Sequence, residues 1–310
     1  MAAGGNIKAD FVWLDGRMLP FAEAQVHVSA FTLHYGLGVF EGVRCYRRAD
    51  GSTVLFRLHD HIQRLYESAK IAAFDIPIEA AVVEAACLQT VRANQLSEGY
   101  VRPLAFTGAG MLGMGARNNP VQVAIIAFPW DAVLGAEAAQ KGIRAHVSSY
   151  TRGPMNGVMS KAKIVGQYAT SVIVKRDSQR LGYDEAIMLD AEGRVTEGSA
   201  ENVFVVWKGQ LFTPPLDLAL LAGLTRDAVL TLAAQLGHPV VERSFSRDML
   251  YAASEVFLTG TATEITPVRE IDGRVIGEGR PGPVTRKIQD AFFAAIRGPG
   301  TPHPEWLAAI

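Results

Sequence analysis

Two short stretches, Ser160-Lys161-Ala162-Lys163 and Glu197-Gly198-Ser199-Ala200-Glu201-Asn202, are the most informative parts of this chain. The first offers a lysine amine, which can hold an aldehyde as a Schiff base. The second offers a carboxylate, which can keep a pyridine nitrogen protonated so that the ring withdraws electrons. An amine and a carboxylate in these settings suit pyridoxal 5'-phosphate as a cofactor.

The sequence on the N-terminal side of these stretches predicts a sheet with helices. Apolar alternation and turn signals indicate extended segments at 11–14, 17–19, 39–46, 53–56, 100–107 and 121–128. Apolar residues recur at helical spacing from Ile62 to Ala73, and again after Pro77. We therefore expect a small α+β domain over residues 1–128.

The pattern breaks near Pro129, and we place an inter-domain linker at 129–137. A larger C-terminal domain, 138–310, would then carry the cofactor lysine. Its expected strands are 143–149, 185–190, 203–207 and 255–259, and its expected helices are 163–181, 225–236 and 284–296. Helices and strands mix without strict alternation, which favours an α+β fold over a doubly wound sheet.

Bulk composition excludes several classes of partner. The 310 residues carry a formal net charge of -1 and no block of like charges, which argues against nucleic acid and anionic membranes. Only two cysteines are present, so we expect no disulfide framework. No stretch approaches the roughly 20 apolar residues of a membrane span. We expect a cytoplasmic protein.

Two motifs point to chemistry that their context does not support. Gly108-Ala109-Gly110-Met111-Leu112-Gly113 matches a dinucleotide fingerprint, but Asn118-Asn119-Pro120 and a strand follow where a helix would be needed. A loop over a site fits those glycines better. His59-Asp60-His61 offers two imidazoles two positions apart, which point in different directions on a helix. We expect solvated polar residues at a helix start there, and no metal site.

Four segments together resemble the branched-chain amino-acid aminotransferases, class IV enzymes that use pyridoxal phosphate. They are HYGLGVFEGVR at 34–44, YVRP at 100–103, EGSAEN at 197–202 and GTATEITPV at 260–268. The resemblance covers nearly the whole chain, from Val12 to Phe293. It implies the two-domain D-amino-acid-aminotransferase-like fold, or fold type IV. It also implies transfer of an amino group from leucine, isoleucine or valine to 2-oxoglutarate.

The resemblance assigns the catalytic lysine. Lys163 matches the family's Schiff-base lysine, because Gly166, Gln167 and Tyr168 follow it at the family's spacing. Lys161 is a competitor, at a position where the family usually has no lysine. Glu197 matches the partner of the pyridine nitrogen, and Glu201 is a second candidate.

The remaining assignments also follow from the resemblance. Cofactor-binding residues would be Arg57, Lys163, Tyr168, Glu197, Leu224, Thr225 and Thr261, of which Thr225 begins a helix whose free N–H groups suit a phosphate. Substrate-binding residues would be Tyr35, Phe40, Arg44, Tyr100, Arg102, Trp130, Thr261 and Ala262. Arg102 would receive the distal carboxylate of glutamate beside an apolar wall. In the family a loop near Met114 can come from a neighbouring subunit, so we expect at least a homodimer.

Three alternatives stay open on sequence. A D-amino-acid or (R)-amine transaminase shares the fold, although Arg102 weighs against the former. An aminodeoxychorismate lyase also shares Lys163 and Glu197, although the intact run from Phe40 to Arg44 weighs against it. A non-catalytic binding protein would have to keep every cofactor residue by chance. Departures from the family at Lys161, Val133, Tyr150 and Thr263 leave the substrate range open, and a wider pocket is one hypothesis.

Overall fold

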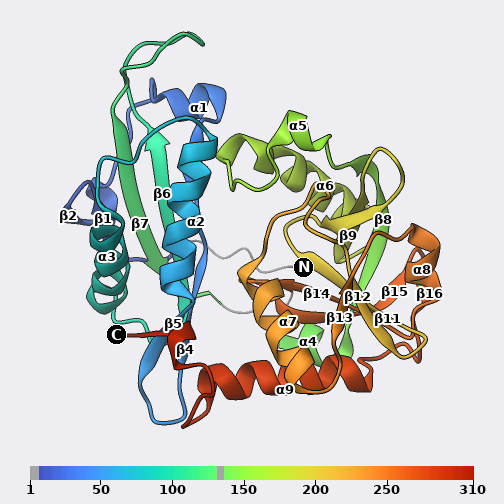
Figure 1. Cartoon of the computed structure of the whole chain (residues 1–310). Coiled ribbons are helices and arrows are strands. Elements are labelled where there is room, and N and C mark those ends of the chain that lie inside the picture. Colours follow the sequence, from blue (N-terminus) through green and yellow to red (C-terminus); the bar gives the residue numbers. More distant parts are fainter. Residues whose placement is uncertain (1–6, 131–135) are drawn as a thin grey trace. The chain divides into compact units, whose positions relative to one another are not determined.

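A computed structural model describes residues 7–130 and 136–310 of the chain, without the side chains of Ala136 and Met155. The described chain forms two compact units, each built on its own sheet (Figure 1). The first unit contains residues 7–130, 162–169 and 296–310, and the second contains 136–161 and 170–295. Val133 and most of the expected linker lie outside the described residues.

An antiparallel sheet forms the first unit, in the order β17-β5-β4-β6-β7-β1-β2 with β3 paired to β6. Its strands are β1 (Phe11–Leu14), β2 (Arg17–Pro20), β3 (Gly38–Phe40), β4 (Val43–Arg47), β5 (Thr53–Phe56), β6 (Gly99–Thr107), β7 (Val121–Phe128) and β17 (Leu307–Ala309). Its helices are α1 (Phe31–Tyr35), α2 (Leu58–Ile71) and α3 (Ala80–Ala93), with short 3-10 turns η1 (Phe21–Glu23) and η3 (Pro304–Trp306). The glycine-rich motif lies in the loop between β6 and β7 and opens no helix.

Helices α2 and α3 bury their apolar stripes in the core of this unit, with Ile62 and Leu65 on α2 and Val83 and Val91 on α3. Helix α2 also buries a polar stripe, formed by His61, Arg64 and Ser68. Residues three and four apart share one face of a helix, so these three side chains line a single edge of α2. This edge supports the site described below.

The segment that carries Lys163 belongs to the first unit, which differs from the expected division of the chain. The Lys163 carbonyl accepts from the Phe40 N–H (3.1 Å), and the Lys163 N–H donates to Ser68 Oγ (3.0 Å). Ile164 forms a bridge with Val39. These strand-like contacts hold the lysine outside any helix, so the helix expected from residue 163 was wrong at its start. A 3-10 turn, η2 (Val165–Gln167), leads into helix α6 (Tyr168–Arg180).

The second unit is a mixed sheet in the order β10-β9-β8-β15-β14-β11-β12-β13, with β16 paired to β15. Strand β10 also pairs with β11, which closes β10, β9, β8, β15, β14 and β11 into a ring. The strands are β8 (Ile143–Thr151), β9 (Glu185–Leu189), β10 (Val195–Gly198), β11 (Asn202–Trp207), β12 (Gln210–Thr213), β13 (Val240–Glu242), β14 (Glu255–Gly260), β15 (Glu264–Ile271) and β16 (Arg274–Val275). The helices are α4 (Ala136–Lys141), α5 (Met155–Val158), α6, α7 (Leu224–Gln235), α8 (Arg247–Tyr251) and α9 (Pro283–Arg297).

The expected strands are all present in the structure, and the helices expected after Pro77, at 225–236 and at 284–296 are also present within a few residues. The extended run expected at 39–46 is two strands, β3 and β4, separated by Glu41 and Gly42. The mixture of helices and strands is α+β, as expected. Within the described residues, no helix combines the length and apolar character that a membrane crossing requires.

Candidate active site

The predicted site residues fall into two groups, one on each unit. The lysine cluster of the first unit consists of Lys163, Tyr168, Phe40, Arg102, Tyr100 and Trp130. The carboxylate cluster of the second unit consists of Glu197, Arg152, Asn202, Leu221 and the start of α7.

In the lysine cluster, the Lys163 amine contacts two aromatic side chains, Phe40 and Tyr168. Lys163 Nζ donates to the Tyr168 hydroxyl. It lies 4.9 Å from the centre of the Phe40 ring and 4.6 Å from the centre of the Tyr168 ring. The two rings meet edge to face, with centroids 4.6 Å apart. Ring faces attract cations, so this setting orients the Lys163 amine.

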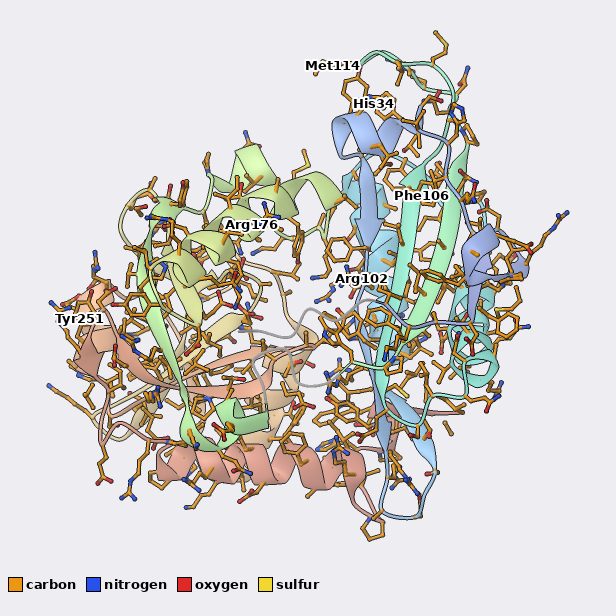
Figure 2. The ribbon with its side chains drawn as sticks, turned by 180° about the vertical axis from the view of Figure 1, so that it is seen from behind. His34, Arg102, Phe106, Met114, Arg176 and Tyr251 are labelled. Carbon is orange, nitrogen blue, oxygen red and sulfur yellow. The ribbon has the colours of Figure 1, made fainter. Side chains whose placement is uncertain are left out.

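Arg102, on β6, also lies near the Phe40 ring, and Figure 2 shows its place on the first unit. Its guanidinium carbon is 4.7 Å from the Phe40 ring centre and 5.2 Å from the Tyr100 ring centre. Tyr100 in turn packs edge to face on Trp130, at 4.5 Å. Arg102 Nε is buried and has no hydrogen-bond partner among the described residues. A guanidinium with an unused donor beside aromatic rings can take a carboxylate next to an apolar group.

A buried ionic network is centred on Glu41, the residue after Phe40 of the lysine cluster. This network was not predicted from the sequence. Glu41 is fully buried and accepts from Arg64 Nε (2.7 Å), Arg64 Nη2 (2.9 Å) and His61 Nδ1 (2.6 Å). Burial alone would raise the pKa of Glu41, but Arg64 and His61 hold it well below its usual range. Burial lowers the pKa of His61. The expectation that His61 is solvated was wrong, because its side chain is buried and bonded to Glu41 in the core. His59 is exposed.

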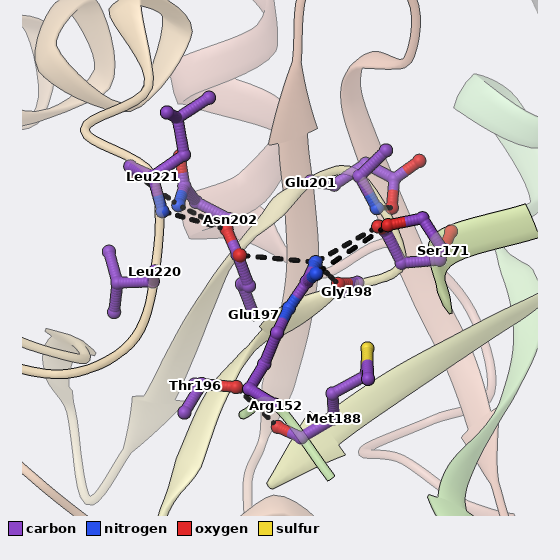
Figure 3. Close-up of polar contacts among 12 residues, drawn as sticks. Arg152, Ser171, Met188, Thr196, Glu197, Gly198, Glu201, Asn202, Leu220 and Leu221 are labelled. Atoms are coloured by element: carbon purple, nitrogen blue, oxygen red, sulfur yellow. Dashed lines mark hydrogen bonds and ion pairs between the residues drawn. The ribbon is translucent and has the colours of Figure 1, made fainter. Parts of the chain in front are cut away.

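The carboxylate cluster is built on the closed ring of strands, where Glu197 on β10 pairs in register with Asn202 on β11 (Figure 3). Glu197 Oε1 forms an ion pair with Arg152 Nη2 at 3.1 Å. Its Oε2 accepts from the Leu221 N–H at 3.2 Å and from Asn202 Nδ2 at 3.4 Å. These donors fix the orientation of the carboxylate.

Arg152 is a second residue that sequence reasoning missed. Besides Glu197, its Nη2 donates to the carbonyls of Gly198 (3.1 Å) and Ser199 (3.0 Å), so one guanidinium fixes both the carboxylate and the turn after it (Figure 3). Arg152 follows the end of β8, and no spacing in the sequence marks it. Only the pairing of strands brings it to Glu197.

The same cluster reaches the N-terminus of α7. Asn202 Nδ2 donates to the Leu221 carbonyl (2.9 Å), and Gly223 precedes the first helical residue, Leu224. A Cβ at Gly223 would lie 2.0 Å from Asn202 Oδ1, so only glycine lets the two approach. No side chain caps the helix at Gly223. The free N–H groups near Leu224 and Thr225 are therefore available to an anion.

The turn between β14 and β15 carries Thr261 and Ala262. Strand β14 pairs with β11, which sets Thr259 opposite Asn202. The hydroxyls of Thr259 and Thr263 are buried and have no hydrogen-bond partner in the part of the chain that the structure describes. Helix N–H groups, unused hydroxyls and a held carboxylate match the phosphate and ring nitrogen of pyridoxal phosphate, so the donor set fits this cofactor.

Three residues predicted to bind the cofactor or the substrate contact side chains outside the two clusters. The Tyr35 ring packs on Phe31 at 4.5 Å and is 44% exposed. The Arg57 guanidinium pairs with Asp60 and lies 5.8 Å from the Trp306 ring centre. Arg44 is buried on β4, and its guanidinium lies 5.9 Å from the ring centre of Tyr46.

In the described residues, no group of histidine, cysteine and acidic side chains is placed to hold a metal ion.

Comparison with known proteins points to one family. Residues 38–271 match the family described as amino-transferase class IV. The chain is 47% identical over 306 residues to the branched-chain-amino-acid aminotransferase of Salmonella typhimurium, covering 98% of both chains. It is 36% identical over 308 residues to the probable branched-chain-amino-acid aminotransferase of Aquifex aeolicus, with the same coverage.

Solved structures agree with this result. The branched-chain amino acid aminotransferase of Escherichia coli superposes with a TM-score of 0.94 at 46% identity, over 97% of this chain and 99% of that one. The enzyme of Thermobaculum terrenum in its pyridoxal phosphate form superposes with a TM-score of 0.91 at 32% identity, over 97% of this chain and 98% of that one.

Proposed function

The chain belongs to the class IV aminotransferases, and from that premise we propose that it moves the amino group of leucine, isoleucine or valine to 2-oxoglutarate. The products are branched 2-oxo acids and L-glutamate. The observation that carries the proposal is the arrangement around Phe40, where one ring lies beside both the Lys163 amine and the Arg102 guanidinium. Such a wall suits an apolar side chain, and the arginine beside it suits a carboxylate.

Class IV aminotransferases depend on pyridoxal phosphate, which when bound draws electrons from the bonds of the substrate α-carbon. Around it, Lys163 is the proposed base that moves a proton at that carbon, with its amine oriented by the Tyr168 hydroxyl. Glu197 would hold a proton on the ring nitrogen of the bound cofactor, and Arg152 and Leu221 keep the carboxylate in place. The N–H groups near Leu224 and Thr225 would receive the phosphate, together with Thr261. Arg57 remains a proposed phosphate ligand from the family resemblance.

One pocket has to accept two unlike side chains in turn. We assign Phe40, Tyr100 and Trp130 to the branched side chain and Arg102 to the distal carboxylate of glutamate. Tyr35, Arg44 and Ala262 remain proposed substrate residues on the same resemblance. The edge-to-face contact of Tyr100 with Trp130 makes a firm apolar surface, whereas the unused Arg102 Nε offers a donor that only a charged substrate needs.

A substrate panel tests this assignment. The protein is mixed in single turnovers with L-leucine, L-glutamate, D-alanine and (R)-phenylethylamine, and the cofactor absorbance is followed. We expect L-leucine and L-glutamate to react fastest. Faster reaction with D-alanine or the amine would contradict the proposal and favour the related transaminases.

The variant Arg102→Met tests whether Arg102 is needed for L-glutamate but not for L-leucine. A charge-assisted hydrogen bond contributes about 1.5–3 kcal/mol, so the rate with L-glutamate should fall by roughly 10- to 100-fold. The rate with L-leucine should stay within about threefold, because the apolar wall is intact. Arg92→Met, at an exposed position of α3, is the matched control. Equal losses for both amino acids would remove Arg102 from the carboxylate role.

We also propose that the chain acts as a homodimer in the cytoplasm. Val28 and Met114 are 74% and 91% exposed, and Met114 lies at the same end of the first unit as His34 (Figure 2). Large apolar side chains in contact with water favour association with another copy. Both cysteines, Cys45 and Cys87, are free and buried, which suits a reducing compartment.

A further inference from the structure

Lys161 lies two residues before Lys163, but its amine bonds to backbone carbonyls and not to an aromatic side chain. Lys161 Nζ donates to the carbonyl of Leu218 (2.9 Å) and to the carbonyl of Leu220 (2.8 Å). Both carbonyls belong to the segment that joins β12 to α7 in the second unit. The side chain is half-buried, so the two carbonyl dipoles replace water around the charge.

The segment tied by Lys161 leads directly to the carboxylate cluster. Leu218 and Leu220 are buried, and the next residue, Leu221, donates its N–H to Glu197 and accepts from Asn202. Two residues later Gly223 begins the turn into α7. A backbone held at residues 218 and 220 fixes the direction of the N–H at residue 221.

The charge of Lys161 also acts on this cluster. Burial lowers the pKa of the Lys161 amine, while Glu197 and Asp217 raise it and Arg226 lowers it. Glu197 therefore faces two cations from different elements, Arg152 by direct contact and Lys161 at longer range. Both cations attract the Glu197 carboxylate.

We propose that Lys161 is a positioning residue that holds the 218–221 segment so that Leu221 donates to Glu197 and α7 begins at Gly223. This inference rests on the proposed function, because it gives the lysine a task in the cofactor site. Lys161 makes no covalent bond in this role. Its loss should loosen the segment and weaken retention of the cofactor, while Lys163 still reacts.

The experiment compares hydrogen–deuterium exchange in the full-length protein as purified with its cofactor. Lys161→Met removes the amine and keeps the apolar stem, and Lys161→Arg keeps a cation. Lys141→Met is the control, since the Lys141 side chain is 62% exposed and pairs with Glu137 on its own helix. Loss of two charge-assisted bonds should speed exchange of the amides at 218–225 by about tenfold or more in Lys161→Met. Lys161→Arg should lie between this variant and the wild type, and Lys141→Met should not differ from the wild type.

A second readout follows loss of visible cofactor absorbance during dialysis. Lys161→Met should lose pyridoxal phosphate about tenfold faster than the wild type, whereas the absorbance maximum should not change. Exchange at 218–225 in Lys161→Met that equals that of the wild type would overturn the proposal. This holds also if the variant loses the visible band completely. If Lys161→Met does not fold, faster exchange confined to 218–225 in Lys161→Arg supports the proposal, and unchanged exchange there overturns it. Exchange requires no turnover, so this result stays separate from failure of the substrate panel.

Discussion

Individual carboxylates in this protein have different neighbours. Glu197 faces Arg152 and a backbone N–H, and Glu41 faces Arg64 and His61. Glu201, four residues after Glu197, is buried near Glu185, and this burial and charge raise its pKa to about 8. Lys175 opposes the rise but does not cancel it. The sequence places Glu197 and Glu201 in one motif, and only the structure shows that Glu197 contacts a guanidinium whereas Glu201 is buried near another carboxylate.

The raised pKa of Glu201 predicts a pH dependence of stability. The folded protein binds this proton more tightly than the unfolded chain, so the contribution is complete below the ordinary value of 4.5 and is lost as the pH rises through about 8. Glu201→Gln cannot ionise at this position. The melting temperature of the variant minus that of the wild type should therefore increase from about pH 6 to about pH 9. Differential scanning calorimetry at both pH values measures this. A constant or falling difference would contradict it, and exposed Glu192→Gln is the control.

At the scale of single elements, helix α2 connects the core to the lysine segment. One edge of the helix presents His61 and Arg64 to Glu41 and Ser68 to the backbone of Lys163. Glu41 follows Phe40, so the same edge fixes the ring beside the Lys163 amine. Close packing at Gly36 adds to this, since a Cβ there would lie 2.7 Å from Gly166 Cα. Gly36 also has a positive φ of 70°.

Removing the charge of Glu41 should destabilise this element. Glu41→Gln leaves the Arg64 and His61 donors facing an uncharged amide in the core, which should cost about 3–5 kcal/mol of unfolding free energy. Urea unfolding near neutral pH measures the loss, with exposed Glu67→Gln on the same helix as the control. A loss below about 1 kcal/mol would show that the network is not stabilised by its charge.

Sequence reasoning succeeded where the signal is local. Turns such as Asp15-Gly16 and the apolar spacing of α3 depend on neighbouring residues, and the structure confirms them. The start of α6 was wrong because Phe40 and Ser68, far away in the sequence, hold Lys163 in an extended form. Arg152 and the Glu41 network were missed for the same reason, since their partners meet only through strand pairing and helix packing.

At the scale of the whole molecule, the assignment to the class IV aminotransferases agrees with a lysine cluster on one unit and a carboxylate cluster on the other. Each cluster is formed by residues of one unit. The family resemblance found in four separate motifs therefore corresponds to two local arrangements of side chains.

The proposed homodimer predicts a single sedimenting species of at least twice the 33.4 kDa chain mass at micromolar concentration. Replacing exposed Val28 and Met114 with serine should weaken association, because about 25 cal/mol of stabilisation per Å² of buried apolar surface is lost. Sedimentation velocity of both proteins measures this. A wild-type protein that sediments as a monomer would contradict the dimer.

The most direct test of the central claim is to find the lysine that holds the cofactor. The protein is treated with borohydride, which fixes bound pyridoxal phosphate to its amine, and the labelled peptide is sequenced by mass spectrometry. The account predicts the label on Lys163, no label on Lys161, and no visible band in Lys163→Ala. A label on Lys161, or a visible band that survives in Lys163→Ala, would contradict it.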